Sequence, residues 1–420
     1  MSYYMYKFNS TYNEIILLIV LSFFDFNFIG TISLADIYIL LASPFLIYKT
    51  NWKDKSLKFI TLTYSLYLIV QIISEFTISN TIENTSKGLA LTIVSFFTFL
   101  FYYDRAKFKP KIFLLLFAGI ALRIIVKDTE LGWNLFEMAT FKFKIGPILI
   151  SVILIISYYL LYKQKYTITA LIFLISSIVF FALDSRSTGL ILLLIAIYLK
   201  KDFRHITFRK TIRVIIISIL PLFGLYSIYV KTVLSGNFAG SHTYKQYSML
   251  NNPYNPLEIL LIGRAEIPVA LKAIYDKPLT GHGSWARDKS GKYRSMQADL
   301  SHFQTDREME LFINSDKNGL PTHSVILGAG AYNGIFALIF ITIIVLFFIR
   351  KCKFALMDNT PFKAILLYTM FFIIWNALFS PLPHFRFTLP LYFAISYSFY
   401  KYRVKNTLML LRKNNTFLNK

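Results

Sequence analysis

Long apolar blocks separated by short polar loops make up most of the 420-residue chain. Most blocks run for roughly 16 to 24 residues, the length that a helix needs to cross about 30 Å of hydrocarbon. They predict about twelve membrane-spanning helices, near 14–30, 33–48, 59–77, 87–103, 111–126, 146–163, 166–183, 187–200, 212–234, 324–349, 362–380 and 386–401. Around Gly30 the first two predicted spans leave little room for a turn. The pattern therefore predicts an all-α polytopic membrane protein.

One long polar segment interrupts this pattern. It divides the chain into nine spans within 1–235, an outer loop at 236–323, three spans within 324–402 and a tail at 403–420. Inside the loop, 257–275 has the periodicity of a helix, so we expect a large loop that contains helices. A second outer segment, 127–145, is predicted to lie in the membrane interface, anchored by Trp133. No internal repeat or separate soluble domain is visible.

The basic residues follow the predicted topology. The formal net charge is +23, but the lysines and arginines gather in alternate short loops, as the positive-inside rule predicts. Both termini are therefore expected in the cytoplasm and the long loop on the opposite face, so the charge does not indicate nucleic-acid binding. The first apolar run lacks a small-residue cleavage site, which favours an uncleaved anchor. The single cysteine, Cys352, can form no intrachain disulfide.

Arg186 lies in a turn of about four residues, 184–187, between two strongly apolar spans on the predicted outer face. Charged side chains are costly at such a position and are commonly functional. The alternative is an arginine at the water interface that pairs with Asp184. The residues by themselves leave both interpretations open.

Arg264 falls on the apolar half of the helix predicted at 257–275, whereas polar residues such as Lys272 fall on the other half. A guanidinium in a packed interface needs an anionic partner. That partner can be a loop carboxylate, for example Glu266, or an anionic ligand. The planar fork of arginine suits phosphate.

His323 lies where the polar loop meets the next apolar span, between Pro321 and Ser324, which we expect to cap the following helix. An imidazole there can act as a general base near neutral pH. A lone histidine at a membrane interface is more often a polar surface residue. The same caution applies to the other polar candidates of the outer segments, His242, His282, His302, His384 and Arg386.

The residues favour chemistry without a metal or other cofactor. A zinc site built from His282, His302 and His323 has no established ligand spacing. Asp25 and Asp36 are too far apart in the chain to read as a paired-carboxylate site. A glycine loop of the nucleotide-binding type is also missing from the sequence.

Four motifs, taken in order, resemble the O-antigen ligase and O-antigen polymerase family of bacterial envelope glycosyltransferases. They are LDSRSTG at 183–189, GR at 263–264 followed by ALKAI at 270–274, KPLTGHG at 277–283, and PTHS at 321–324 with Gly334 in the next span. The motifs cover about 183–345, and the rest is similar only in hydropathy, length and loop placement. The His323-Ser324 pair departs from the His-Asn pair common in ligases, which affects the acceptor contacts more than the donor site.

The resemblance implies a fold similar to the GT-C class in the bacterial inner membrane, with a periplasmic active site. The donor would be a glycan on undecaprenyl diphosphate, transferred with inversion and without a metal. Arg186 and Arg264 would hold the diphosphate, and His323 would take the acceptor's proton or orient its hydroxyl. The remaining candidates for contacts to the acceptor or sugars are His282, Trp285, His302, Ser324 and Arg386. The loop's aromatic side chains suit sugar stacking and plain packing equally.

Two other functions compete with O-antigen ligation, in which the glycan is transferred to lipid A-core for lipopolysaccharide biosynthesis. A polymerase would join one lipid-linked repeat to another and would have a similar donor site. The histidine motif favours the ligase. The high Phe, Tyr, Ile and Lys content is also common in polymerases. A transporter of lipid-linked sugars would show two repeated halves and more ionisable residues within its spans. The ionisable residues predicted within spans are few: Asp25, Asp36, Glu75 and Arg123.

Overall fold

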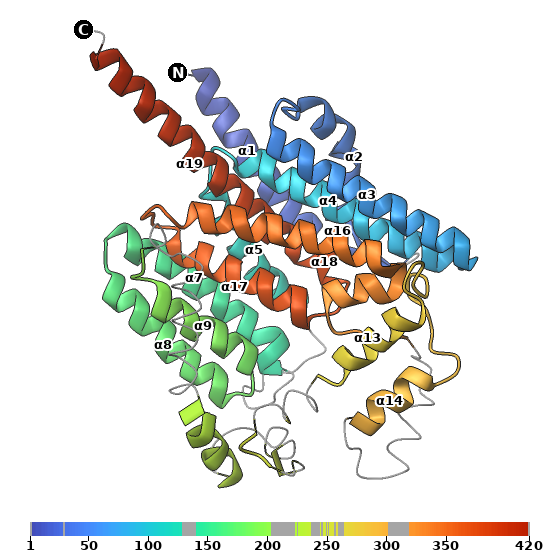
Figure 1. Ribbon diagram of the computed structural model, residues 1–420. Coiled ribbons are helices and arrows are strands. Elements are labelled where there is room, and N and C mark those ends of the chain that lie inside the picture. The colour runs from blue at the N-terminus through green and yellow to red at the C-terminus, as the bar shows by residue number, and fades with distance from the viewer. Residues whose placement is uncertain are drawn as a thin grey trace.

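The computed structural model spans residues 1–420 and describes all of them except 1, 28–29, 128–139, 203–222, 225, 237–243, 245–246, 249, 251, 256–257, 259–263, 301–318 and 419–420. Helices dominate the described chain (Figure 1). The elements are α1 (Ser2–Leu21), β1 (Asp25–Asn27), β2 (Thr31–Ser33), α2 (Leu34–Lys49), α3 (Lys55–Ile78), α4 (Ile82–Ala106), α5 (Ile112–Lys127), the π-helix η1 (Phe141–Ile145), α7 (Gly146–Tyr162), α8 (Tyr166–Ala182), α9 (Arg186–Tyr198), α13 (Glu266–Asp276), α14 (Lys292–Leu300), α16 (Val325–Ala355), α17 (Lys363–Phe379), α18 (His384–Phe387) and α19 (Leu389–Leu418).

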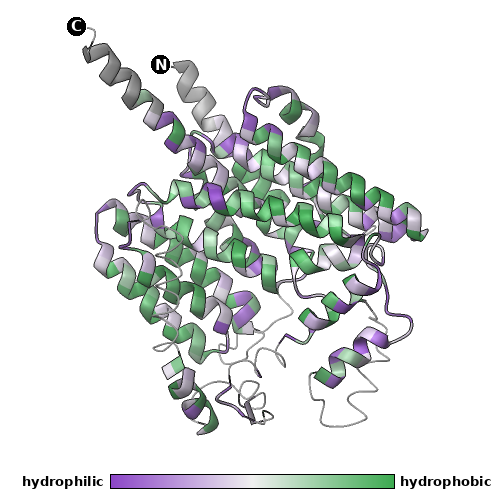
Figure 2. Cartoon of the chain, viewed as in Figure 1, coloured by the Kyte–Doolittle hydropathy of each residue, from purple (hydrophilic) through white to green (hydrophobic). Residues whose placement is uncertain are grey.

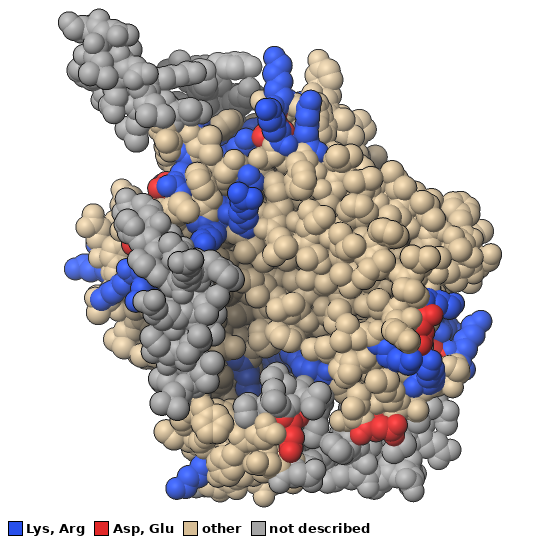
Figure 3. Space-filling model, viewed as in Figure 1, with Lys and Arg blue, Asp and Glu red and all other residues tan. Residues whose placement is uncertain are grey.

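The apolar helices agree with an all-α membrane protein. Four described helical segments are long and apolar enough to cross a membrane: Lys55–Ile78, Ile82–Ala106, Phe141–Tyr162 and Val325–Ala355. Shorter apolar helices stand beside them, and hydrophobic residues dominate the helical bundle (Figure 2). On the face drawn in Figure 3, a broad area over the centre and right has no charged side chains, and charged residues gather above it, below it and at the left edge. The full count of twelve spans stays a prediction.

Ten of the twelve predicted spans coincide with described helices, and an eleventh, 14–30, overlaps α1 only at 14–21. The other, 212–234, lies largely outside the described residues, although 226–234 is helical. The first span is displaced, because α1 ends at Leu21 and a two-stranded antiparallel hairpin, with Asp25 opposite Ser33, fills the predicted continuation. The hairpin thus separates α1 from α2. Gly30, which has a φ of +129°, lies in the connection between its two strands.

The basic loops predicted to share one face do meet at one end of the bundle. Lys49 Nζ lies 3.2 Å from Asp104 Oδ2, at the end of α4. Lys351 Nζ, near the end of α16, donates to Ser56 Oγ at 3.0 Å, at the start of α3. The orientation of this end with respect to the cytoplasm stays a prediction.

Helix α16 is interrupted at Gly334, and the loop before it fills the break. Gly334 has φ +84° and ψ 179°, outside the helical region. The N–H of Ile335 donates to Pro278 O at 2.7 Å, while the N–H groups of His282 and Gly283 donate to α16 carbonyls, Ala331 O at 3.0 Å and Tyr332 O at 2.8 Å. The glycine-turn segment 278–283 therefore completes the hydrogen bonding of the broken helix.

The helix predicted at 257–275 is described only in part, because 257 and 259–263 lie outside the described residues. Arg264 and Ala265 form a turn, and α13 begins at Glu266. Pro268 explains this turn, because a proline has no N–H to donate and its ring would clash with the carbonyl of the residue four positions earlier, which is Arg264. The prediction that Arg264 lies on a helix face is therefore wrong. It lies in the turn that leads into the helix.

Candidate active site

A buried carboxylate on α3 holds the glycine-turn segment against the helices. Glu75, only 3% exposed, accepts hydrogen bonds from the backbone N–H of Ser284 at 2.8 Å and from the side-chain amides of Asn80 at 2.6 Å and Asn333 at 3.2 Å. Asn80 also donates to Ser284 O at 3.0 Å. A buried charge is costly unless it is hydrogen-bonded, so these donors fix the loop at Ser284 and its neighbour Trp285.

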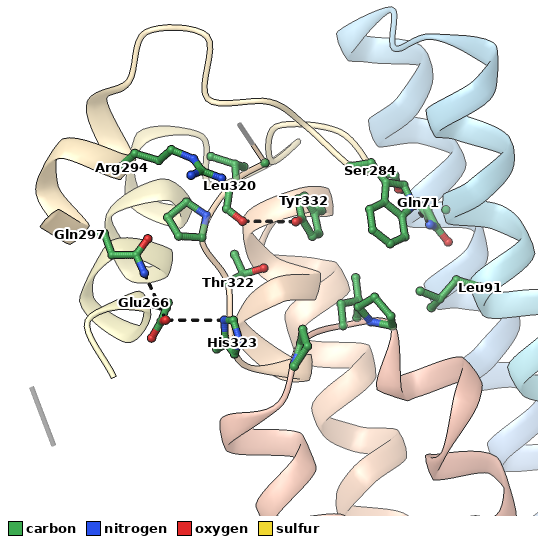
Figure 4. Close-up of a pocket in the computed structure, with 17 residues that line it drawn as sticks. Gln71, Leu91, Glu266, Ser284, Arg294, Gln297, Leu320, Thr322, His323 and Tyr332 are labelled. Carbon is green, nitrogen blue, oxygen red and sulfur yellow. Dashed lines mark hydrogen bonds and ion pairs between the residues drawn. The ribbon is translucent and has the colours of Figure 1, made fainter. Parts of the chain in front are cut away.

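A cavity of about 440 Å³ opens beside this anchored loop. Its walls come from α3, α4, α13, α14, the residues before α16 and the connection between α17 and α18 (Figure 4). Polar side chains on this lining include Gln71, Glu266, Arg294, Gln297, Thr322 and His323. Trp285 also lines the cavity and is 40% exposed, so one aromatic face is accessible beside the polar groups.

His323 and Glu266 lie side by side on one wall of the cavity (Figure 4). His323 Nδ1 lies 3.7 Å from Glu266 Oε1, and Gln297 Nε2 donates to the same oxygen at 3.1 Å. The imidazole is half exposed, whereas the Glu266 side chain is 19% exposed. A carboxylate near one imidazole nitrogen favours the proton on that nitrogen and leaves the other free to act as a base. Glu266 is the first residue of α13, where a negative charge is favoured by the helix dipole.

Arg264 extends from the turn before α13 to the end of α17. Its Nη1 donates to Phe379 O at 3.3 Å, and its guanidinium lies 5.7 Å from the Trp375 ring centroid and 5.3 Å from that of Phe379. Burial lowers the pKa of Arg264, Glu266 acts in the opposite direction, and the positive charge of Arg186 lowers it further. The guanidinium is thus near both a carboxylate and a second arginine.

Arg186 is the first residue of α9, directly after a turn in which Asp184 has a φ of +57°. Its side chain donates a hydrogen bond to Tyr247, a buried residue of the polar segment 236–323. Its charge acts on Arg264, and the charges of both arginines act on Lys142. The positive charges of Lys142 in η1, Arg186 in α9 and Arg264 in the turn before α13 therefore act on one another.

Lys142 is the member of this group that the sequence did not predict. It lies in η1, where the N–H of Gly146 bonds to Phe141 O, five residues earlier, in place of the usual four. Pro147 follows at once and would clash with the carbonyl four positions before it in a regular helix, which accounts for the wider turn. Single π-turns occur often at functional sites. The sequence analysis placed Lys142 in a segment predicted only as an interfacial anchor.

The three predicted catalytic residues are joined in a chain of interactions. Arg186 acts on Arg264, and Glu266 acts on Arg264 while it also lies beside His323. The carboxylate that the sequence offered as one partner for Arg264 is therefore present, but it is shared with the histidine. The arrangement has a cationic part, a carboxylate at its centre and a half-exposed imidazole on the cavity wall.

Of the other predicted contact residues, Trp285 lines the cavity, and three have defined contacts elsewhere. Ser324 caps α16, as predicted: its Oγ accepts from Leu327 N at 3.1 Å and donates to Ala377 O at 2.9 Å. The ring of His282 bonds to Ala273 O at 3.0 Å and to the Tyr293 hydroxyl at 3.2 Å. Arg386 donates to Asp36 Oδ2 at 2.8 Å and to Thr31 O at 3.2 Å. His242 and His302 lie outside the described residues.

No known protein-family model matches the chain, and no curated protein is similar to it. Within the described parts of the chain, no group of three or more His, Cys, Asp or Glu side chains is placed to hold a metal ion. The resemblance to O-antigen ligases and polymerases therefore depends on the four motifs alone.

Proposed function

We propose that the chain is a membrane glycosyltransferase that moves a glycan from undecaprenyl diphosphate to an acceptor hydroxyl. The observation that supports this best is the gathering of Lys142, Arg186 and Arg264 next to the Glu266–His323 pair. Cations that lie close together repel one another, and a bound polyanion relieves that repulsion. A general base beside an anion site is the combination that glycosyl transfer from a diphosphate needs.

The cations would act on the leaving group. As the bond between the anomeric carbon and the diphosphate oxygen breaks, its electron pair leaves with the oxygen, and negative charge grows on the diphosphate. Fixed positive groups aimed at that charge stabilise the transition state more than the ground state. Arginine can bind two phosphate oxygens through its planar fork, which suits Arg186 and Arg264. A lipid-linked donor also explains why such a site belongs among apolar helices.

His323 would act on the acceptor. Its Nε2 would take the hydroxyl proton while the acceptor oxygen forms a bond to the anomeric carbon, on the face opposite the leaving group, so the configuration inverts. Glu266 would stabilise the imidazolium that results. The cavity of about 440 Å³ lies within the usual range for small-ligand sites, and Trp285 offers a stacking surface for a sugar ring.

Within this class we favour the ligase reaction, transfer to lipid A-core on the periplasmic face of a bacterial inner membrane. Polymerisation of lipid-linked repeats is the alternative, because its donor site is similar and only the acceptor differs. Deletion of the gene separates them: loss of a ligase exposes bare core, and loss of a polymerase leaves core with a single repeat.

The test is transfer by the purified protein from a lipid-diphosphate-linked glycan. Arg264→Ala and Lys142→Ala should each reduce the rate by on the order of 10²–10³-fold, and His323→Ala by about 10²-fold or more. Arg287→Ala and Lys289→Ala are matched controls, because both side chains are exposed and neither lines the cavity. Activity that persisted in both Arg264→Ala and His323→Ala would refute the site, and movement of the donor across a membrane without transfer would favour a transporter.

A further inference from the structure

A second cavity, of about 530 Å³, lies at the opposite end of α3 and α4 from the candidate active site. On α3 it is lined by Leu57, whereas the active-site cavity is lined by Gln71, about 21 Å further along at 1.5 Å per residue. On α4 it is lined by residues of the last two turns, including Tyr103 and Asp104. Both helices are candidate membrane spans, so the cavity lies where they would leave the hydrocarbon.

Three lysines line this second cavity, and two of them are held by carboxylates. Lys401 Nζ lies 2.5 Å from Asp54 Oδ2, and Lys107 Nζ lies 2.6 Å from Asp104 Oδ1. The third, Lys405, lies over the ring of Phe108, 4.5 Å from its centroid. No carboxylate in the described part of the chain forms an ion pair with Lys405.

Positive charge exceeds negative charge around this cavity. Asp104 is bound by Lys49 and Arg105 in addition to Lys107, and Arg105 also binds Glu14. The described cluster thus has two more cations than carboxylates, its members being Lys49, Arg105, Lys107, Lys401, Lys405, Glu14, Asp54 and Asp104. The carboxylates position the lysines without neutralising the whole group, so an anion can still gain charge-assisted hydrogen bonds here.

Apolar side chains of the same lining indicate where the anion comes from. Phe108 is 62% exposed and Met409 is 51% exposed, and both line the cavity beside the lysines. A soluble phosphate would make no use of this surface. An acyl chain would, and basic pockets at the ends of membrane spans bind anionic headgroups.

We propose that this cavity binds the headgroup phosphate of an anionic phospholipid. Lys401 and Lys405 bind the phosphate oxygens, and an acyl chain lies along Phe108 and Met409. The site is separate from the proposed transfer chemistry, and its occupancy is measured without any transfer assay.

The experiment is native mass spectrometry of the full chain with phosphatidylglycerol and, as the neutral comparison, phosphatidylcholine of the same acyl composition. Phosphatidylglycerol should bind about tenfold more tightly, and the double variant Lys401→Gln/Lys405→Gln should lose that preference. Lys405→Gln alone should lose part of it, and because no described carboxylate pairs with Lys405 this variant leaves the Asp54 pair intact. Lys58→Gln is the control, since Lys58 is exposed on α3 and does not line the cavity.

Equal binding of the two lipids, or an unchanged preference in the double variant, would overturn the proposal. A parallel arm adds millimolar inorganic phosphate. If phosphate displaces phosphatidylglycerol completely and binds in its absence, the site recognises the free anion and the lipid assignment is wrong. Retention of phosphatidylglycerol under these conditions supports the lipid assignment.

Discussion

Two parts of the polar segment 236–323 differ in how tightly the rest of the chain holds them. The glycine-turn segment 278–283 is fixed by backbone hydrogen bonds to α16, and the next residue, Ser284, donates its N–H to the buried carboxylate of Glu75. The group formed by Arg264, Glu266 and His323 has longer contacts, 3.3 Å from Arg264 Nη1 to Phe379 O and 3.7 Å from His323 Nδ1 to Glu266 Oε1. The first part shapes the cavity, and the second presents charged groups that can rearrange around a ligand.

The two carboxylates of these regions illustrate the difference. Among the described residues, the donors to Glu75 are all neutral, on Ser284, Asn80, Asn333 and Thr85, and Glu75 is buried. Glu266 has a neutral donor, Gln297, but also lies near an imidazole and a guanidinium, on the cavity wall. A carboxylate among neutral donors anchors a loop, whereas one between two ionisable groups can take part in moving charge.

The largest effect is expected from Gly334→Ala. A Cβ at this position would overlap the carbonyl oxygen of Leu279, and φ is +84°, so the loop would be pushed out of the helix break. We expect the free energy of unfolding to fall by about 3 kcal/mol or more. The measurements are the unfolding midpoint in detergent, which should be lower, and the rate of proteolysis within 278–284, which should be higher. Gly224→Ala is the control, because no described atom lies within 4 Å of the place where its Cβ would stand. Equal midpoints would show that the loop is not seated in α16.

Glu75→Gln should have the next largest effect. The amide would direct its own N–H groups at the donors of Ser284 or Asn80, which leaves buried donors unsatisfied at a cost of about 1–3 kcal/mol. Hydrogen exchange across 278–285 should accelerate accordingly. Glu83→Gln is the matched control, since Glu83 is exposed and pairs with Lys87 on its own helix. If both variants exchange alike, Glu75 is not the anchor.

Glu266→Gln should affect rate and leave the fold intact. It keeps the oxygen that accepts from Gln297 but removes the charge beside His323, so kcat should fall about tenfold or more with little change in KM. Asp276→Asn, on the same helix but outside the cavity lining, should retain activity. A fall in stability equal to that of Glu75→Gln would remove the distinction between the two carboxylates.

The smallest effect is a pH dependence of the contact between α13 and α14. Burial lowers the pKa of His282, partly opposed by its bond to Ala273 O, so the folded state favours the neutral ring. Stability from this contact is therefore complete above the ordinary value of 6.5 and declines as the pH falls below it. Hydrogen exchange of α13 and α14 at pH 7.5 and 5.5 measures the change. His282→Asn should abolish the pH dependence, and an equal change in that variant would assign it to another group.

Apolar periodicity predicted most of the helices, because helices that pack in a membrane carry long apolar runs whatever their tertiary contacts. It also located Arg186 between two spans and Ser324 at the start of a helix. The turns at Gly281 and Gly283, with φ angles of +65° and +85°, lie in the KPLTGHG motif. Periodicity could not show that these turns enter a break in α16, because that contact joins segments about fifty residues apart in the chain.

The candidate site was predicted only in part, because several of its residues are brought to the site by contacts between distant segments of the chain. The apolar pattern continues through Arg264, so periodicity places it on a helix face and gives no weight to the effect of Pro268 on the helix start. No local signal marks Lys142 as a site residue, because its place beside the arginines depends on the wide turn before Pro147 and on tertiary packing. Glu266 is recognisable as a partner for Arg264, but its position beside His323 follows from the docking of α13, which local sequence does not reveal.

The break at Gly334 also has a consequence for the order in which the chain is made. The carbonyls of Ala331 and Tyr332 have their partners in His282 and Gly283, and unsatisfied carbonyls are costly within a bilayer. The ribosome makes residues 278–283 about fifty positions before it makes these carbonyls. The donors therefore exist before the broken helix enters the membrane, and the helix can be completed by a segment already synthesised.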